Sequence, residues 1–199
     1  MLSGIVASLL KKYYKEENKN MKKILYCRVA WMDFYNFEIC PIDRIDNGGS
    51  HPAKGKHEIY NFQKINNWFY GYVQIPKTIN IVKNLGAYKD DLKVEHISVV
   101  WVATNPQHGG QVIVGWYNDA NVYKENQSLH EEALENRPKH DVKVYNISSK
   151  SAFLLPIDKR KFNICKTVLG QNQFGYGDDK TNKKVFSYIR KIEKIGKMN

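Results

Sequence analysis

Apolar and polar residues alternate with the period of a β-strand over much of the chain after Met21. Turn residues separate the short alternating or apolar runs, and Asn105-Pro106 and Gly109-Gly110 are the strongest of these signals. The runs are KILYCRVAW, KHEIYNF, WFYGYVQI, TINI, EHISVVWVAT, QVIVGWYN, ANVYKE, VKVYNI and SAFLLP. About seven to nine short strands with turns between them predict a small β-barrel or a strongly curled mixed sheet with flanking helices.

The first twenty residues have helical periodicity instead. Their apolar positions fall on one helix face, which is typical of an amphipathic helix: Leu2, Ile5, Val6, Leu9, Leu10 and Tyr13. A second methionine, Met21, stands just before the first predicted strand. We therefore interpret residues 1–20 as a helical extension and residues 21–199 as a single α+β domain.

Two further helices are predicted inside that domain. SLHEEALEN is typical of a short helix with Ser128 as its N-cap. DDKTNKKVFSYIRKIEKIGK predicts a basic C-terminal helix, with Asp178 or Asp179 near its positive end. The apolar face of this helix is formed by Val185, Ile189 and Ile192.

Positive charge and aromatic content point to a polyanionic partner. The 199 residues include 31 Lys and Arg against 20 Asp and Glu, which gives a net charge of +11. This excess predicts attraction to polyanions such as nucleic acid or an acidic membrane surface. Aromatic residues make up 13%, and flat side chains beside positive charge suit stacking on bases. Solvated lysines and an ordinary β-rich core explain the same two features.

The cysteines indicate a reducing compartment, and the hydropathy indicates that no segment spans a membrane. Cys27, Cys40 and Cys165 are odd in number and widely spaced, so they predict neither a disulfide framework nor a zinc knuckle. No apolar run reaches the ~18–20 residues that cross a bilayer. The charges of residues 1–20 follow the apolar part, which is the reverse of a secretory signal. We therefore expect a cytoplasmic protein that does not associate with membranes.

The histidine motifs do not match known metal or nuclease sites. His57-Glu58 is followed by Asn61 where a zinc-protease helix needs a second histidine. HEEALENRPKH shares letters with an HNH nuclease, but its spacing is too tight for that metal site. GGSHPAKGK lacks the Gly-Lys-Ser/Thr ending of a phosphate-binding loop. We expect no metal, no cofactor and no nuclease activity within the chain.

Three stretches combine aromatic rings with polar groups, which is what a pocket for a base requires. AWMDFYNF follows the first strand, and HEIYNF as a strand would carry His57 and Asn61 on one face and Glu58 on the other. In GWYND, Gly115 permits close approach, and the two aromatic residues after it point to opposite faces. For any single aromatic residue here a place in the core is the commoner outcome, and Trp101 is expected there outright.

Two longer stretches carry a family resemblance. NGGS…GKHEIYNF…FYGYVQ and VVWVATNPQHGGQVIVGWYNDANVYKE resemble a module at the N-terminus of modification-dependent HNH-type restriction endonucleases. That module is similar to the PUA superfamily, which includes EVE, YTH and ASCH-type readers. The likeness runs from about Lys23 to Tyr188. It includes GQNQFGYG, which departs at Gln173 and Gly175 from the Gly-Gln-Ser-Asn-aromatic pattern of the family.

The resemblance implies a small PUA-like barrel that holds one flipped base in an aromatic pocket. The base would be modified, most often a methylated cytosine or adenine. No nuclease domain is predicted before Asn199, so cleavage would need a partner nuclease. The predicted base-binding residues are Trp31, Tyr35, His57, Asn61, Trp116, Tyr117, Gln171 and Asn172, and the predicted phosphate-binding residues are Lys54, Lys56, Lys183 and Lys184.

Three hypotheses about function follow. The first is a non-enzymatic reader of a modified base, in DNA rather than RNA, within a restriction or defence system. The second is an enzyme that acts on a nucleotide or small molecule, with His57 or Glu58 as the acid–base group. The third is a protein-interaction module that regulates a partner nuclease. Salt-dependent nucleic-acid binding distinguishes the first from the third, and turnover without added metal identifies the second.

Overall fold

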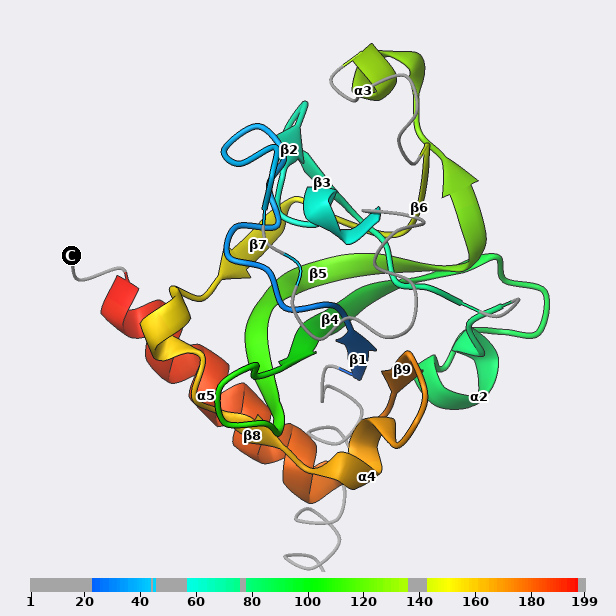
Figure 1. The fold of residues 1–199 in the computed structure, drawn as a ribbon. Coiled ribbons are helices and arrows are strands. Elements are labelled where there is room, and N and C mark those ends of the chain that lie inside the picture. Colours follow the sequence, from blue (N-terminus) through cyan, green and yellow to red (C-terminus); the bar gives the residue numbers. More distant parts are fainter. Residues whose placement is uncertain (1–22, 44, 46–56, 76–77, 136–142, 197–199) are drawn as a thin grey trace, which may run out of the picture.

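Figure 1 shows the computed structural model, which describes residues 23–43, 45, 57–75, 78–135 and 143–196. The protein is α+β, with a nine-stranded mixed sheet and a few helices. The predicted helical extension at residues 1–20 lies outside the described residues, as do Lys54 and Lys56.

The sheet follows the path β2-β3-β6-β5-β4-β1-β9, and β7 and β8 pair with β5 off this path. Within the described residues only β1 and β4 pair in parallel, and the other pairs are antiparallel. The strands are β1 (Ile24–Arg28), β2 (Lys64–Ile65), β3 (Trp68–Gly71), β4 (Lys93–Thr104), β5 (Gln111–Ser128), β6 (Val144–Ser149), β7 (Ser151–Leu154), β8 (Asn163–Ile164) and β9 (Phe174–Gly175).

Short helices connect the strands, and one long helix ends the described chain. The helices are α2 (Ile81–Leu85), α3 (Glu131–Glu135), α4 (Lys166–Leu169) and α5 (Asp179–Gly196), with 3-10 turns η1 (His57–Tyr60) and η2 (Ile157–Lys159). The predicted basic C-terminal helix is confirmed as α5, and Asp178 accepts a hydrogen bond from the Thr181 amide at its start. The predicted short helix is confirmed as α3, but Ser128 is not its N-cap, because Ser128 ends β5 and the helix begins at Glu131.

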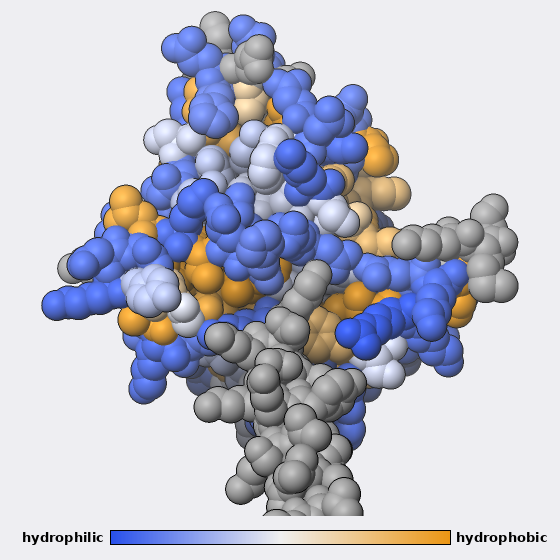
Figure 2. Space-filling view, turned by 180° about the vertical axis from the view of Figure 1, so that it is seen from behind, coloured by the Kyte–Doolittle hydropathy of each residue, from blue (hydrophilic) through white to orange (hydrophobic). Residues whose placement is uncertain are grey.

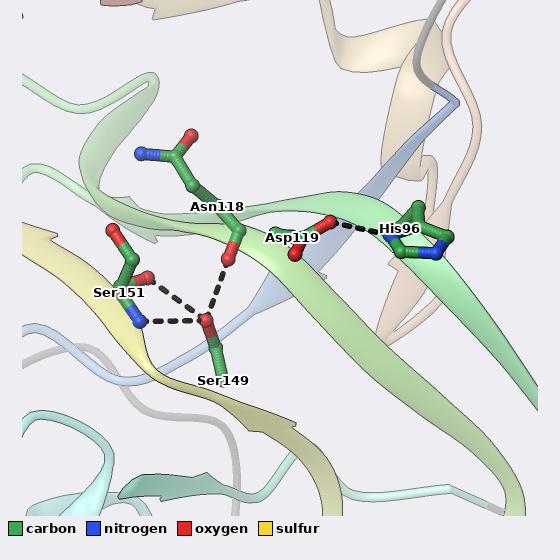
Figure 3. A network of polar contacts seen from close by, with 5 residues as sticks. All are labelled: His96, Asn118, Asp119, Ser149 and Ser151. Carbon is green, nitrogen blue, oxygen red and sulfur yellow. Dashed lines mark hydrogen bonds and ion pairs between the residues drawn. The ribbon is translucent and has the colours of Figure 1, made fainter. Parts of the chain in front are cut away.

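The sheet bends but does not close. Among the described residues β2 and β9 end the path and do not pair with each other, so a closed barrel is not formed there. Register shifts between β4 and β5 mark β-bulges, which bend and twist a strand pair. At one bulge His96 and Asp119 both adopt positive φ, and their side chains meet at 2.7 Å (Figure 3). Nearby, the Ser149 hydroxyl donates to Asn118 O at 2.6 Å and fixes the step from β6 to β7 (Figure 3).

Both faces of the central strands are buried, as the strand period requires. In β1, Leu25 and Cys27 face one core cluster, whereas Ile24 and Tyr26 face another. The first cluster is covered by the segment after β1 and by η1, and the second is covered by α4 and α5 (Figure 1). A third, smaller cluster lies between α3 and the β2–β3 hairpin.

Three sequence-based strand assignments were wrong. HEIYNF is not a strand: it forms η1 and a turn, so its residues do not alternate between two faces. TINI leads into α2, where the Asn80 side chain caps the helix by accepting from the Lys83 amide. ANVYKE is not a separate strand, because β5 continues through it to Ser128. In the first two cases a polar side chain satisfies backbone groups that a strand partner would otherwise satisfy.

Gly115 confirms the expected close approach of another segment. A Cβ at this position would lie 2.5 Å from the Phe153 carbonyl oxygen and 2.6 Å from Phe62 Cζ. No side chain fits there without movement of the β7 backbone. This contact lets β7 pair with β5 immediately beside Trp116.

We expect Trp116→Ala to destabilise the fold as much as Trp101→Ala does, by ~3–5 kcal/mol each. Both side chains are fully buried, so each truncation leaves a large cavity. Urea unfolding of the two variants measures the loss. Trp68→Ala is the control, because Trp68 is only half-buried. A Trp116→Ala variant no less stable than Trp68→Ala would show that the Trp116 ring does not contribute to the core.

Candidate functional site at the end of strand β1

Trp116 and Tyr117, two of the predicted base-binding residues, lie in the core. They point to opposite faces of β5 as expected, and each is fully buried. The Trp116 ring stacks on Phe153 with centroids 4.7 Å apart, and its Nε1 donates to Glu193 of α5 at 3.0 Å. The Tyr117 hydroxyl donates to the Asn61 carbonyl oxygen. A base that stacked on Trp116 would have to displace Phe153, so this structure offers no open ring face there.

Trp31 and Tyr35 are also covered. The buried guanidinium of Arg160 lies 5.1 Å from the Trp31 ring centroid and 5.7 Å from that of Tyr35. It donates hydrogen bonds to the carbonyl oxygens of Leu155, Met32 and Asp33. The Asp43 carboxylate accepts from the amides of Asp33, Phe34 and Tyr35. These bonds hold the segment after β1 in one conformation, and the two aromatic rings are part of that scaffold.

The side chain of Asn61 binds the backbone, which was one of the two roles that the sequence left open for it. Its side-chain amide donates to Tyr72 O at 3.1 Å and accepts from Tyr72 N at 2.8 Å. Asn146 binds Val73 in the same two-bond manner, at 2.7 and 3.2 Å. Both amides therefore take the place of a neighbouring strand where β3 has ended. The Asn61 side chain is consequently engaged with the backbone.

The remaining predicted residues are on or near the surface. His57 is half-buried, and its ring lies 4.7 Å from that of Tyr72, tilted by 33°. Gln171 and Asn172 are exposed in the turn before β9. Lys183 and Lys184 are exposed on α5. Base or phosphate binding by any of these residues stays a prediction.

Three distant segments meet at the carboxyl end of β1. The Glu58 carboxyl in η1 accepts a hydrogen bond from the Ala30 amide through Oε2, at 2.7 Å. β1 pairs with β4 along one edge, and along its other edge Cys27 pairs with Phe174 of β9. The Arg28 amide donates to Gln173 O, and its guanidinium donates to Gly170 O. The predicted segments HEIYNF and GQNQFGYG thus both contact the chain at the end of β1.

Half-buried aromatic rings accompany these segments. Phe174 and Tyr176 pack against the first core cluster, with ring centroids 6.3 Å apart. The Tyr176 hydroxyl reaches Asn80 O at 3.4 Å. Tyr72 brings the second pair, with His57. We name Glu58, His57, Tyr72, Phe174 and Tyr176 the β1-end site.

The Glu58 carboxyl is the group in this site whose ionisation is most altered. The residue is half-buried, but its carboxyl is enclosed, and this desolvation raises its pKa from 4.5 to about 7. The hydrogen bond from the Ala30 amide opposes the rise. Near neutral pH the carboxyl therefore exists in both neutral and ionised forms.

The neighbouring groups keep their protons at neutral pH. Burial raises the pKa of the Cys27 thiol well above its usual range, and Glu58 raises it further. Burial, followed by Glu58, also raises the pKa of Tyr72. Burial raises the pKa of Tyr35, although Arg160 opposes this. Desolvation is thus the main cause of the raised pKa at each of these four groups. Among them, Glu58 is the group that exchanges a proton near neutral pH.

Sequence reasoning named Glu58 only as an acid–base alternative, and it missed Tyr72, Phe174 and Tyr176. Tyr72 comes directly after β3 within the run WFYGYVQI, and no motif singled it out there. The sequence signal for Phe174 and Tyr176 was the glycine-spaced stretch GQNQFGYG. Its two aromatic residues flank Gly175, at the end of the strand β9 that pairs with β1. No sequence spacing indicated that Glu58 would reach the Ala30 amide.

The described residues include no group of three or more His, Cys, Asp or Glu side chains placed to hold a metal ion. Within the same residues no helix is long and apolar enough to cross a membrane. All three cysteines are free, and Cys27 is buried. On the face shown in Figure 2, hydrophilic residues predominate and hydrophobic residues gather in smaller areas between them.

Comparison of the chain with protein-family models, with curated proteins and with solved structures found no significant match in any of the three.

We expect Glu58 to make the protein less stable as pH rises from about 4.5 to about 7. Its pKa is raised on folding, so the folded state holds the proton more tightly and stability is lost as the group ionises. The shift corresponds to a loss on the order of 3 kcal/mol. Urea unfolding at several pH values measures it.

Glu58→Gln should remove this dependence, so the variant should gain stability over the natural protein as pH rises. Glu38→Gln is the matched control, because Glu38 is exposed. Equal pH profiles for the natural protein and Glu58→Gln would mean that the Glu58 carboxyl is not desolvated.

Proposed function

We propose that the protein is a cytoplasmic nucleic-acid-binding reader that holds one flipped, modified base at the β1-end site. The observation that carries the proposal is the meeting of a polar carboxyl with two pairs of half-buried rings at one strand end. A flipped base is read by stacking and by hydrogen bonds to its edge, and these are the groups that such reading needs. The net charge of +11 supports a polyanionic partner.

The resemblance to PUA-like readers supports the same proposal. It gives methylated cytosine or adenine as the expected base, DNA rather than RNA as the polymer, and a small barrel as the finer description of the fold. It also suggests a restriction or defence system in which a partner nuclease cuts. In this proposal the stacking surface comes from His57–Tyr72 and Phe174–Tyr176, while Trp31 and Trp116 support the scaffold.

The phosphate contacts are assigned to α5. One face of this helix packs on the second core cluster through Val185 and Ile189. The opposite face exposes a row of basic side chains, which suits contact with a phosphate backbone: Lys180, Lys183, Lys184, Arg190, Lys191 and Lys194. Positioning by this face and selection by the β1-end site are separate tasks, and they can be tested separately.

Acid–base catalysis on a nucleotide is the second candidate. A carboxyl with a pKa of about 7 suits a general acid or base at neutral pH. Product formation from a nucleotide without added metal, abolished in Glu58→Gln, would favour this candidate. Tight binding of an unchanged oligonucleotide would favour the reader.

The deciding experiment is a binding screen with DNA duplexes that carry single modified bases, measured by fluorescence anisotropy at two salt concentrations. The proposal expects one modified duplex to bind at least about 10-fold more tightly than its unmodified counterpart, since stacking on one base contributes ~1–3 kcal/mol. Equal binding of all duplexes would contradict base reading.

We expect Lys183→Ala/Lys184→Ala to weaken binding of modified and unmodified duplexes alike. Removal of two phosphate contacts should lower the slope of log affinity against log salt by about 2, because each contact releases about 0.9 counterion. Lys64→Ala/Lys143→Ala removes the same charge at exposed positions near β2 and β6, away from α5 (Figure 1). An equal change of slope in both double variants would show that α5 is not the phosphate-binding face.

A further inference from the structure

The hydrogen bond between Glu58 and Ala30 determines which carboxyl oxygen is the acceptor and which carries the proton. Oε2 accepts from the Ala30 amide at 2.7 Å, so Oε2 is the carbonyl oxygen when the group is neutral and the proton resides on Oε1. A carbonyl oxygen has two lone pairs, of which the Ala30 amide uses one. The neutral carboxyl therefore presents one acceptor, Oε2, beside one donor, Oε1–H, in a fixed order.

That order matches some base edges and not others. Cytosine and adenine carry an exocyclic amino donor beside a ring nitrogen acceptor, whereas thymine and hypoxanthine carry an exocyclic oxygen acceptor beside a ring N–H donor. A donor facing a donor leaves buried polar groups unpaired, which is costly in an enclosed site. The ionised carboxyl has no donor, and it cannot pair with the ring nitrogen of cytosine or adenine.

Resting on the proposed function, we propose that Glu58 selects the base: its neutral carboxyl accepts from the exocyclic amino group of cytosine or adenine through Oε2 and donates to the adjacent ring nitrogen through Oε1–H. Loss of the Glu58 proton then releases the base. The affinity for these bases is consequently highest below neutral pH and falls as the carboxyl ionises. The pKa of about 7 places this fall in the physiological range.

Other titratable groups lie near Glu58. Cys27 of β1, Tyr35 of the segment after β1 and Tyr72 after β3 all have raised pKa values, so they remain protonated between about pH 6 and about pH 8.5. His57, which also carries an ionisable side chain, lies next to Glu58 on η1. A Glu58 variant that leaves His57 in place separates the two.

The test uses pairs of DNA duplexes that differ only at one base, placed opposite an abasic site so that it is free to flip. One pair compares 5-methylcytosine with thymine, which share the methyl group and differ in donor and acceptor order. The other pair compares adenine with hypoxanthine. Fluorescence anisotropy gives the affinity of the full chain for each duplex at about pH 6 and about pH 8.5, at constant ionic strength.

We expect the natural protein to prefer 5-methylcytosine over thymine, or adenine over hypoxanthine, at the lower pH. This preference should fall roughly 10- to 30-fold at the higher pH, because the neutral fraction of a group with a pKa of about 7 falls by that factor. Glu58→Gln should keep the preference at both pH values within about threefold, because the amide supplies an acceptor and a donor that do not titrate. Glu38→Gln, an exposed control, should behave like the natural protein.

Two results would overturn the inference while leaving the reader function intact. One is tighter binding of a modified duplex with no preference for 5-methylcytosine over thymine and none for adenine over hypoxanthine. The other is a pH-dependent preference that persists unchanged in Glu58→Gln, which would assign it to His57. If no duplex binds better than an unmodified, fully paired one, the proposed function fails and the inference fails with it. Thermal melting of Glu58→Gln confirms that its fold is retained.

Discussion

The pairing of β5 on both of its edges is the constraint on which the rest of the structure depends. One edge pairs with β4 along much of its length, and the other is shared in turn by β6, β7 and β8. Strands of two to six residues are not stable alone, so the short strands β6, β7 and β8 are each positioned by their place along β5. The bulges between β4 and β5 bend this central pair of strands. Because of this bend, β6, β7 and β8, which pair with successive parts of β5, lie on different sides of the molecule.

Outside the sheet, buried polar side chains replace the missing strand partners. Asn61 and Asn146 each bind one backbone unit through both of their amide groups. Asp43 and Arg160 do the same for the segment after β1, since one accepts from its amides and the other donates to its carbonyl oxygens. Buried backbone groups must be paired, and these side chains make irregular segments as well defined as strands. The rigid surroundings of the β1-end site follow from that.

Much of the fold could be predicted from alternation and turn chemistry. The strands around Trp101 and Trp116, the turn at Asn105-Pro106 and the basic helix α5 carry strong local signals, and the structure contains each of them. The expected barrel is not formed by the described residues, because alternation predicts that strands exist but not whether the first and last of them meet. HEIYNF was misassigned because its β-forming residues give a strand pattern, while the hydrogen bonds of Glu58 and Asn61 that favour a turn involve residues far along the chain.

The candidate site was harder to predict than the fold, and the reason is physical. When both faces of a sheet are covered, the aromatic residues of its strands fill the core, as Trp116 and Tyr117 do. Groups available to a ligand then lie where the regular pairing stops, and the end of β1 is such a place: Glu58 accepts a hydrogen bond from the amide of Ala30, two residues beyond the strand, and β9 pairs with only two residues of β1. The sequence contains both segments, but it does not indicate that both contact the end of β1, because they are separated by more than a hundred positions along the chain. A carboxyl enclosed in this way has its ionisation set by the fold rather than by its neighbours in the chain, and this is why the chemistry of the site depends on tertiary structure.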